Sequence, residues 1–477
     1  MTELDAVVVG AGPNGLAAAV TLAAAGLAVH VVEGASTAGG GCRTEQLTLP
    51  GFSHDVCSTI HPLAVASPFF QQFDLSVHGL KLHYPEIAYS QPFDDGTAAA
   101  AYKSLTRTAD ELGPGGASWR RFMQPLVEHA DAIVPAALAP LRSVPAHPFQ
   151  AARLLPHALR SAAGVAGRLE GARARALFSG VAAHAMLPLN RSPTGGFGTM
   201  LALLAHAVGW PAVEGGSQRI TDALVAHLQA LGGTIETGRW VTSLSELPAS
   251  RVVLLDVAPQ QLLDLACGSM PAAFARQLRG YRYGPGVCKL DWALSGPVPW
   301  TAEACRRSGT VHLGGTFEEV ARSEAEVAAG HHPEAPYTLV VQAGVVDPTR
   351  APAGQQALWA YCHVPAGSTV DMTERIERQI ERFAPGFRDL ILARSVLTAA
   401  DEQVEHPNYI GGDINVGAAT VRQTVFRPTV RWNNYRTPMK GVYLCSSATP
   451  PGGGVHGMCG YHAARSALRR EFGIRAR

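Results

Sequence analysis

Residues 4–34 read LDAVVVGAGPNGLAAAVTLAAAGLAVHVVEG, and this stretch decides the fold. The run Ala6–Val9 is short, rich in valine and bounded by glycine, which predicts a buried parallel strand. A helix is predicted after it, and Val29–Val32 is predicted to form a second strand. This order of elements is typical of a dinucleotide-binding α/β unit.

Three glycines occupy the turn between the first strand and the helix. Gly10 permits the tight turn, Gly12 lets the backbone approach a pyrophosphate, and Gly15 lets the helix lie close to the strand. The N-terminus of the helix offers unpaired N–H groups and a partial positive charge to phosphates. Glu33 ends the second strand, placed to accept hydrogen bonds from a ribose diol. An acid there favours an unmodified ribose, so NADP is not expected, while FAD and NAD remain open.

The composition excludes some classes of protein. Of the 477 residues 47% are hydrophobic and 16% charged, against about 25% charged in a typical soluble protein. This deficit fits an interior lined for an apolar ligand, a surface that meets a membrane, or simply an alanine-rich chain. The net charge of +1 gives no electrostatic case for nucleic acid as a partner.

The sequence shows no targeting or metal-binding pattern. No run of about eighteen apolar residues offers a membrane span. The first strand begins near residue 6 with no basic and apolar segments ahead of it, so no signal peptide is expected. The eight cysteines form no C-x-x-C pair and show no zinc spacing with histidine. We therefore expect a cytoplasmic protein with reduced thiols and no metal site.

The middle of the chain changes character twice. Segments 82–91 and 97–103 predict a hairpin, and residues 104–208 predict helices rich in alanine and leucine. Arginines scattered among apolar residues from Arg142 to Arg175 suggest contact with a membrane surface, with an ordinary solvated helix face as the alternative. The α/β pattern returns near residue 215. The elements predicted from there are strands at 234–237, 240–244, 251–256, 286–295, within 336–363 and at 442–445, and helices at 219–231, 316–329, 371–384 and 455–470.

Blocks spread over nearly the whole chain resemble the phytoene desaturase and carotenoid isomerase family of FAD-dependent oxidoreductases. The likeness is closest to its branch of pyridine nucleotide-disulphide oxidoreductase domain-containing protein 2. It rests on the N-terminal VVGAGPNGLAAA, on the glycine cluster with Arg43-Thr44-Glu45, and on three later blocks. These blocks are HAVGWP with GGSQ at 206–218, GGDI at 411–414, and YRTP at 435–438 running into PGGGVHGMCG at 451–460.

The resemblance implies a Rossmann-like α/β FAD-binding domain with an inserted α+β substrate or cap domain. The FAD domain would comprise residues 1–80, 209–285 and 411–477, and the cap would comprise 81–208 and 286–410. The ADP half of FAD would be held by Gly10, Gly12, Pro13, Asn14, Gly15 and Glu33.

For the rest of the cofactor, the resemblance implies that Gly39, Gly40 and Gly41 approach the pyrophosphate and that the backbone of Val241 contacts adenine. Ser447, Gly457 and Met458 would lie at the pyrophosphate, ribitol and flavin ring. Related amine oxidases carry Arg directly after the glycine pair, whereas here Gly41 stands there and Arg43 comes two places later, so a phosphate role for Arg43 is left open.

The expected activity is transfer of a hydride from an apolar substrate to non-covalently bound FAD. The substrate would be an isoprenoid, polyene or acyl compound, enclosed by apolar residues of the cap such as Phe149, Leu155, Phe178 and Met186. His456 is the candidate proton-transfer residue, with capping or packing as its alternative role. Two other readings remain open: a redox-neutral flavin-dependent double-bond isomerase, and a non-catalytic interaction protein that retains FAD.

Overall fold

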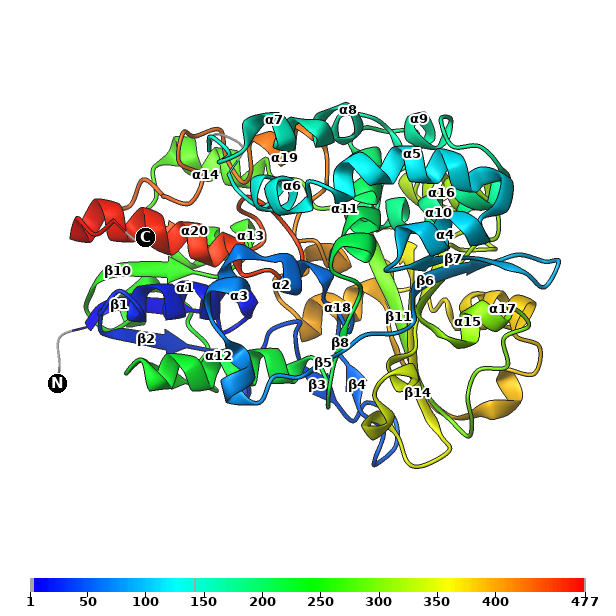
Figure 1. The fold of residues 1–477 in the computed structure, drawn as a ribbon. Coiled ribbons are helices and arrows are strands. Elements are labelled where there is room, and N and C mark those ends of the chain that lie inside the picture. Colours follow the sequence, from blue (N-terminus) through cyan, green and yellow to red (C-terminus); the bar gives the residue numbers. More distant parts are fainter. Residues whose placement is uncertain (1–3, 141–142, 476–477) are drawn as a thin grey trace.

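The computed structural model describes residues 4–140 and 143–475 and contains two main sheets (Figure 1). The first is a five-stranded sheet in the order β16-β10-β1-β2-β9, in which all the strands are parallel. Its strands are β1 (Leu4–Val9), β2 (Val29–Val32), β9 (Thr234–Glu236), β10 (Ser250–Leu255) and β16 (Val442–Leu444). They come from three separated parts of the chain, as a cofactor domain divided by insertions requires.

Alternate residues of this sheet face two layers of helix. Ala6, Val8 and Val31 share a core with α1 (Pro13–Ala23), α12 (Gln218–Ala230) and α20 (Met458–Ala467). Val7, Val9 and Val32 face α13 (Pro259–Leu265) and α14 (Ala272–Arg279) on the other side. Both faces are therefore covered, which explains the nearly continuous hydrophobic strands in the sequence.

The second sheet has seven strands in the order β15-β11-β14-β13-β12-β6-β7. Only the β12–β6 pair is parallel among its described neighbours. The strands are β6 (Ile87–Pro92), β7 (Ala98–Tyr102), β11 (Gly286–Leu294), β12 (Ser308–Leu313), β13 (Thr338–Val341), β14 (Gln356–Val364) and β15 (Ile391–Leu397). Two short pairs complete the sheets: β3 (Thr44–Glu45) with β4 (His54–Asp55), and β5 (Leu82–His83) with β8 (Ala212–Val213).

Helices cover both faces of the seven-stranded sheet. One face packs on α17 (Thr373–Phe383) through a separate apolar core. The other face shares its core with α10 (Ala172–Ala182) and α11 (Thr194–Ala207). The remaining helices of this half are α4 (Leu105–Glu111), α5 (Gly116–Val127), α6 (Ala130–Ala137), α7 (Pro148–Ala151), α8 (Leu155–Ala158), α9 (Ala162–Ala166), α15 (Glu303–Arg306), α16 (Phe317–Ala328) and α18 (Ala399–Glu405).

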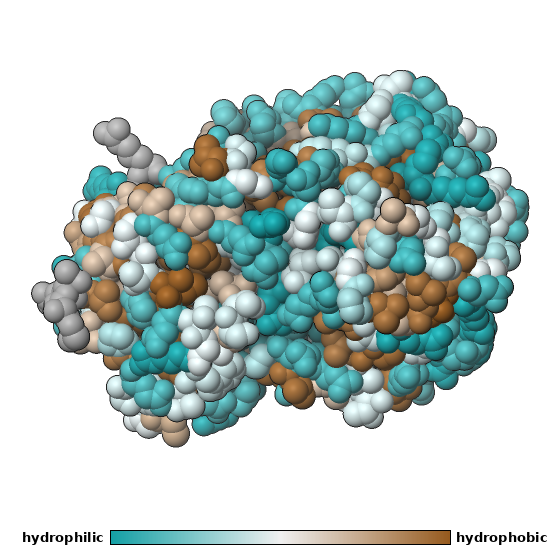
Figure 2. Space-filling model, turned by 90° about the horizontal axis from the view of Figure 1, so that it is seen from below, coloured by the Kyte–Doolittle hydropathy of each residue, from teal (hydrophilic) through white to brown (hydrophobic). Residues whose placement is uncertain are grey.

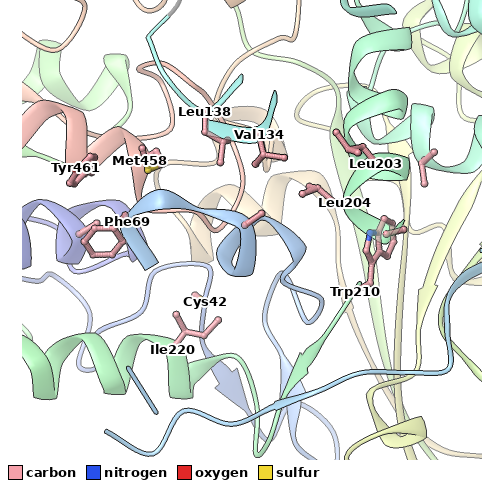
Figure 3. Packing of buried hydrophobic residues seen from close by; sticks show 14 of the residues in the cluster. Cys42, Phe69, Val134, Leu138, Leu203, Leu204, Trp210, Ile220, Met458 and Tyr461 are labelled. Carbon is pink, nitrogen blue, oxygen red and sulfur yellow. The ribbon is translucent and has the colours of Figure 1, made fainter. Parts of the chain in front are cut away.

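One hydrophobic core joins the two halves. Figure 3 shows Phe69, Met458 and Tyr461 near the cofactor-type sheet, and Leu203, Leu204 and Trp210 near the seven-stranded sheet. Val134 and Leu138, which lie in and just after α6, stand between these two groups. The short helices α2 (Pro62–Ala66) and α3 (Pro68–Gln72) also pack here, whereas α19 (Val421–Val425) is a separate short helix near the top of Figure 1.

The structure confirms the α/β fold class and corrects several details. The predicted strand at 240–244 is absent: residues 240–243 are irregular, and a 3₁₀ turn spans Leu244–Glu246. The final helix begins at Met458, three residues later than expected. The hairpin forms from β6 and β7, because residues 82–83 pair with β8 instead.

The expected apolar lining of the cap is also wrong in part. Phe149 is 87% exposed and Leu155 57% exposed, so neither residue lines an interior space. Phe178 and Met186 are buried, as expected. The face seen from below carries its hydrophobic residues in separate patches among hydrophilic ones (Figure 2).

The described chain contains no candidate bilayer-crossing helix, since none combines sufficient length with sufficient apolar character.

Candidate cofactor and substrate site

The turn after β1 forms as the glycine spacing predicts. Gly10 has φ +95° and donates its N–H to the Val32 carbonyl oxygen at 2.8 Å, which fixes the start of the turn. A Cβ on Gly15 would lie 2.0 Å from the Gly10 oxygen, so only glycine allows the helix to approach this closely. Gly12 caps α1, and Pro13 is the first residue of the helix.

Glu33 turns back toward this loop. Its carboxylate accepts hydrogen bonds from the N–H of Ala11 at 2.6 Å and of Ala35 at 2.8 Å. The ring of Trp240 covers the neighbouring Gly34. A Cβ on Gly34 would lie only 2.3 Å from the indole. Val241 follows and is buried in the core below the sheet. The acid is thus oriented at the carboxyl end of β2, and Trp240 covers the glycine next to it.

The second glycine cluster packs against the first. Gly39 donates its N–H to the Ala11 oxygen at 3.0 Å, and a Cβ on Gly40 would lie 3.2 Å from the Cα of Gly12. A Cβ on Gly41 would lie 2.0 Å from the hydroxyl of Tyr409, a residue that the sequence analysis did not select. Side chains are excluded on both sides of this loop.

Arg43 lies close by but is engaged in an ion pair. Its Nε is 3.3 Å from a carboxylate oxygen of Glu45, and its side-chain stem lies against Gly39. The Arg43 Nε has no hydrogen-bond partner in the described structure, so a phosphate role for this residue stays open.

The C-terminal block meets the N-terminal unit directly. The Asn14 side-chain amide donates to the Ser447 hydroxyl at 3.2 Å, across 433 residues of sequence. Gly457, at φ +66°, caps α20, and Met458 opens that helix with a buried side chain. A Cβ on Gly460 would lie 1.8 Å from the Asn14 oxygen, so α1 and α20 touch through their backbones.

His456 serves as a structural residue in this arrangement. Its Nδ1 accepts the Met458 N–H at 3.0 Å, and its Nε2 lies 3.2 Å from the Gly452 oxygen. Burial lowers its pKa to about 4, so the imidazole stays neutral at neutral pH. With both ring nitrogens held by the backbone, His456 caps the loop before α20, and we do not retain it as a catalytic residue.

Asp256 lies beneath the glycine turn and was not selected from the sequence. It follows β10 directly, and its carboxylate accepts the Gly15 N–H at 2.8 Å. Burial raises its pKa to about 7, and the nearby charge of Glu33 acts in the same direction. An acid placed directly after a strand of a parallel sheet was the available signal, since the carboxyl ends of such strands meet at one edge.

The seven-stranded sheet presents a charged and aromatic face to the other half. Lys289 and Asp291 of β11 form a buried ion pair and lie in register with Tyr361 and Trp359 of β14. Their alternation with apolar residues in the strand at 286–294 was a signal that the sequence analysis left unused. The Trp359 indole donates to the Thr59 hydroxyl at 2.8 Å, which ties this face to the cofactor half.

Cys57, His184 and Tyr409 are half-buried side chains with shifted pKa values. Desolvation raises the pKa of Cys57 to about 11, lowers that of His184 to about 3 and raises that of Tyr409 above its usual value. All three side chains are therefore uncharged at neutral pH.

The residues present fit a dinucleotide. The Asn14 side-chain oxygen is buried without a hydrogen-bond partner in the described structure, directly at the turn where a ligand would lie. The glycines at 12, 39 and 40 keep side chains out of the same region, and the N-termini of α1 and α20 both point there.

Comparison with known proteins supports this interpretation. Residues 8–73 match the model of the NAD(P)-binding Rossmann-like domain. The chain is 28% identical to pyridine nucleotide-disulfide oxidoreductase domain-containing protein 2 of Mus musculus, covering 98% of this chain and 94% of the relative. It is 26% identical to all-trans-zeta-carotene desaturase of Myxococcus xanthus, covering 94% and 90%. These homologues confirm the resemblance predicted from the sequence.

The fold also matches a solved structure. An oxidoreductase from Methanosarcina mazei superposes with a TM-score of 0.66 at 15% identity, covering 98% of this chain and all of the other. This chain therefore shares its fold with a solved oxidoreductase, and its relatives include a carotene desaturase.

Proposed function

We propose that this chain, whose homologues and fold are those of FAD-dependent oxidoreductases, is a desaturase or dehydrogenase that removes a hydride from an apolar substrate. The observation that carries the proposal is the contact of Asn14 with Ser447, which brings the N-terminal glycine turn and the C-terminal glycine–helix unit to one site. The relative from Myxococcus xanthus is named as a carotene desaturase, which supports an isoprenoid or polyene substrate.

Different residues of the chain would hold different parts of FAD. Glu33 would accept hydrogen bonds from the ribose, and Gly12 and Gly40 leave room for the pyrophosphate. Val241 would meet adenine through its backbone, and the N-terminus of α20 at Gly457 would face the flavin, where its dipole favours negative charge. When bound, without a covalent bond, FAD supplies the hydride acceptor at N5.

The described residues suggest little side-chain acid–base chemistry. His456 is held by the backbone, and burial keeps His184 neutral at neutral pH. The task of the protein is then to orient an activated C–H bond and to exclude water.

We also propose that part of the cap contacts a membrane surface. Val144, Phe149, Leu155 and Leu159 are 57–89% exposed along one stretch that also carries Arg153 and Arg160. At the far end of the basic stretch, Arg175 pairs with Glu318 at 2.6 Å and Arg173 donates to the Ala98 oxygen, so these two arginines serve the fold. Arg142 lies outside the described residues. The proposed contact therefore narrows to residues 144–160.

Sedimentation with anionic vesicles tests this contact. Phe149→Ser should reduce the bound fraction because it removes an exposed apolar side chain, while Val404→Ser, at a 78% exposed position outside the stretch, serves as the control. Equal sedimentation of the two variants and the parent chain would contradict the membrane contact.

Anaerobic mixing of the FAD-loaded protein with candidate substrates tests the activity. Flavin bleaching that persists until an oxidant is added supports the dehydrogenase. Turnover without net redox change, by protein whose flavin has first been reduced, would favour the isomerase. A flavin that no substrate or chemical reductant can reduce would favour the non-catalytic alternative. Bleaching by a small charged amine, with no response to lipid-like compounds, would overturn the substrate class.

A further inference from the structure

Four rings, three of them buried, form a compact cluster where the seven-stranded sheet meets the helices of the cap. Tyr89 lies 4.8 Å from Trp210 and 5.4 Å from His312, measured between ring centroids. His184 lies 5.2 Å from His312 and 6.2 Å from Trp210. Tyr89 and His312 come from strands of the sheet, while His184 and Trp210 follow helices of the cap.

This cluster carries polar atoms that the fold leaves unpaired. The hydroxyl of Tyr89, which is 0% exposed, has no hydrogen-bond partner in the described part of the chain. Neither has the hydroxyl of Thr310, which is 1% exposed and pairs in register with Tyr89 on the same face. Leaving a buried hydroxyl without a hydrogen-bond partner costs about 1–3 kcal/mol of folding free energy. Two such hydroxyls on one face of the sheet therefore point to a ligand that supplies the partner.

Two other unpaired atoms have a different explanation. The Nδ1 of His312 and the Oε1 of Gln91 lie 2.6 and 2.7 Å from the position of a Cβ on Gly180, so both are packed against α10. The groups of the cluster that remain available to a ligand are therefore the hydroxyls of Tyr89 and Thr310 and the ring of His184.

A series of contacts connects the cluster to the C-terminal block. His184 is half-buried, and its Nε2 lies 3.1 Å from the Nε2 of His312. Two residues on, the sulfur of Met186 accepts a hydrogen bond from the Asn415 amide at 3.1 Å. Asn415 in turn touches Gly453, in the loop that leads into α20. These contacts link the cluster to the proposed flavin site.

We propose that Tyr89, Thr310 and His184 form a subsite that binds the oxygen of a neutral hydroxyl or carbonyl group on an otherwise apolar substrate. The inference rests on the proposed function and narrows its substrate class. A pure hydrocarbon would leave both hydroxyls without partners. A carboxylate would need a cation, but burial lowers the pKa of His184 to about 3 and also lowers that of His312.

Binding of matched ligands to the FAD-loaded protein tests the subsite. Geranylgeraniol, the C20 hydrocarbon that lacks only its hydroxyl, and the C20 acid are titrated from cyclodextrin, and dissociation constants are read from the flavin absorbance change. The parent chain should bind the alcohol about tenfold more tightly than the hydrocarbon, since each hydrogen bond adds about 0.5–1.5 kcal/mol. The acid should bind more weakly than the alcohol.

Two variants separate the subsite from the fold. Tyr89→Phe and Thr310→Val should each remove a large part of the preference for the alcohol and leave hydrocarbon binding unchanged. Because neither hydroxyl has a partner in the described structure, neither variant should lower Tm. Tyr443→Phe is the matched control: its hydroxyl donates to Glu471 at 2.9 Å, so this variant should lower Tm and keep the preference.

Each outcome decides the proposal. Equal binding of alcohol and hydrocarbon by the parent chain would overturn the subsite alone, and so would an unchanged preference in both variants, which would assign the two hydroxyls to bound water. Binding of none of the C20 ligands by a chain that holds FAD would overturn the apolar substrate class together with the subsite.

Discussion

Replacement of Asp256 by asparagine should make the protein more stable at alkaline pH. Asp256 lies under the glycine turn, where its carboxylate accepts the Gly15 N–H at 2.8 Å and its carbonyl oxygen accepts the Asn408 amide at 3.0 Å. Asparagine keeps an acceptor for Gly15 and has nearly the same shape. The substitution therefore removes the negative charge with little change in packing.

The magnitude follows from the pKa of the buried carboxyl. Burial raises the pKa of Asp256 from 3.8 to about 7. Between these two pH values the carboxyl is protonated in the folded state but ionised in the unfolded state. The free energy of unfolding of the parent chain therefore falls as the pH rises from about 4 to about 7, with no further loss above that. At about 1.4 kcal/mol per pH unit, this carboxyl lowers the free energy of unfolding at pH 8 by about 4 kcal/mol at most.

The assay is urea unfolding of Asp256→Asn and the parent chain at pH 5 and pH 8. The stabilisation by asparagine should be about 2–3 kcal/mol larger at pH 8 than at pH 5. FAD should also bind more tightly to the variant at pH 8, because an anion is removed from beside the proposed pyrophosphate site. A stabilisation equal at the two pH values, or a loss of stability at pH 8, would refute the argument from desolvation.

The remaining predictions concern the cofactor and the packing that supports it. Glu33→Ala should weaken FAD binding by about 1–3 kcal/mol in a flavin titration, whereas an unchanged affinity would show that the carboxylate serves only the N–H groups that hold it. Gly460→Ala should lower the free energy of unfolding by at least about 2 kcal/mol, because its Cβ would strike the Asn14 oxygen. Gly296→Ala, with open space around it, is the control, and equal effects of the two variants would contradict the close helix contact. NADH and NADPH at micromolar concentration should not bleach the flavin, since the sequence has one dinucleotide fingerprint and FAD would occupy it; rapid stoichiometric bleaching would count against this.

The parts of the site that were predictable are those whose signal is local in sequence. The strand, the three glycines and Glu33 lie within 30 residues and each has a distinct backbone or hydrogen-bonding role. The glycine contacts of Gly10 and Gly15 are those that the spacing predicts. The C-terminal half of the site, including Ser447, was predicted only from the resemblance to a known family. No local pattern in the sequence connects Ser447 to Asn14.

The missed residues act on the same loop from distant parts of the chain. Asp256, Trp240 and Tyr409 contact the glycine segments across more than 200 residues, so no local spacing reveals these contacts. Only Asp256 had a sequence signal, its place directly after a strand. The expected strand at 240–244 failed for a related reason. Its apolar residues cover Gly34 and fill the core below the sheet, and this tertiary packing prevails over a weak strand propensity.

Composition was a poor guide to which cap residues enclose the substrate. Phe149 and Phe178 have the same side chain and lie in the same alanine-rich segment, yet the first is 87% exposed and the second is buried. Only the packing of α10 against the sheet separates them. The sequence also could not predict that the hydroxyls of Tyr89 and Thr310 lack partners. An unpaired hydroxyl is recognised only when its surroundings are known.

FAD binding is tested by the flavin content of the purified protein. We expect a yellow protein with about one FAD per chain, released by acid precipitation because it is bound without a covalent bond. Gly12→Val should remove the FAD, because its side chain would fill the space left for the pyrophosphate. The extended backbone of Gly12, at φ −70° and ψ 174°, accepts any residue, but the Asp256 carboxylate 3.0 Å from the new Cβ must shift slightly. A folded parent chain that is colourless and cannot be reconstituted with FAD would contradict the account.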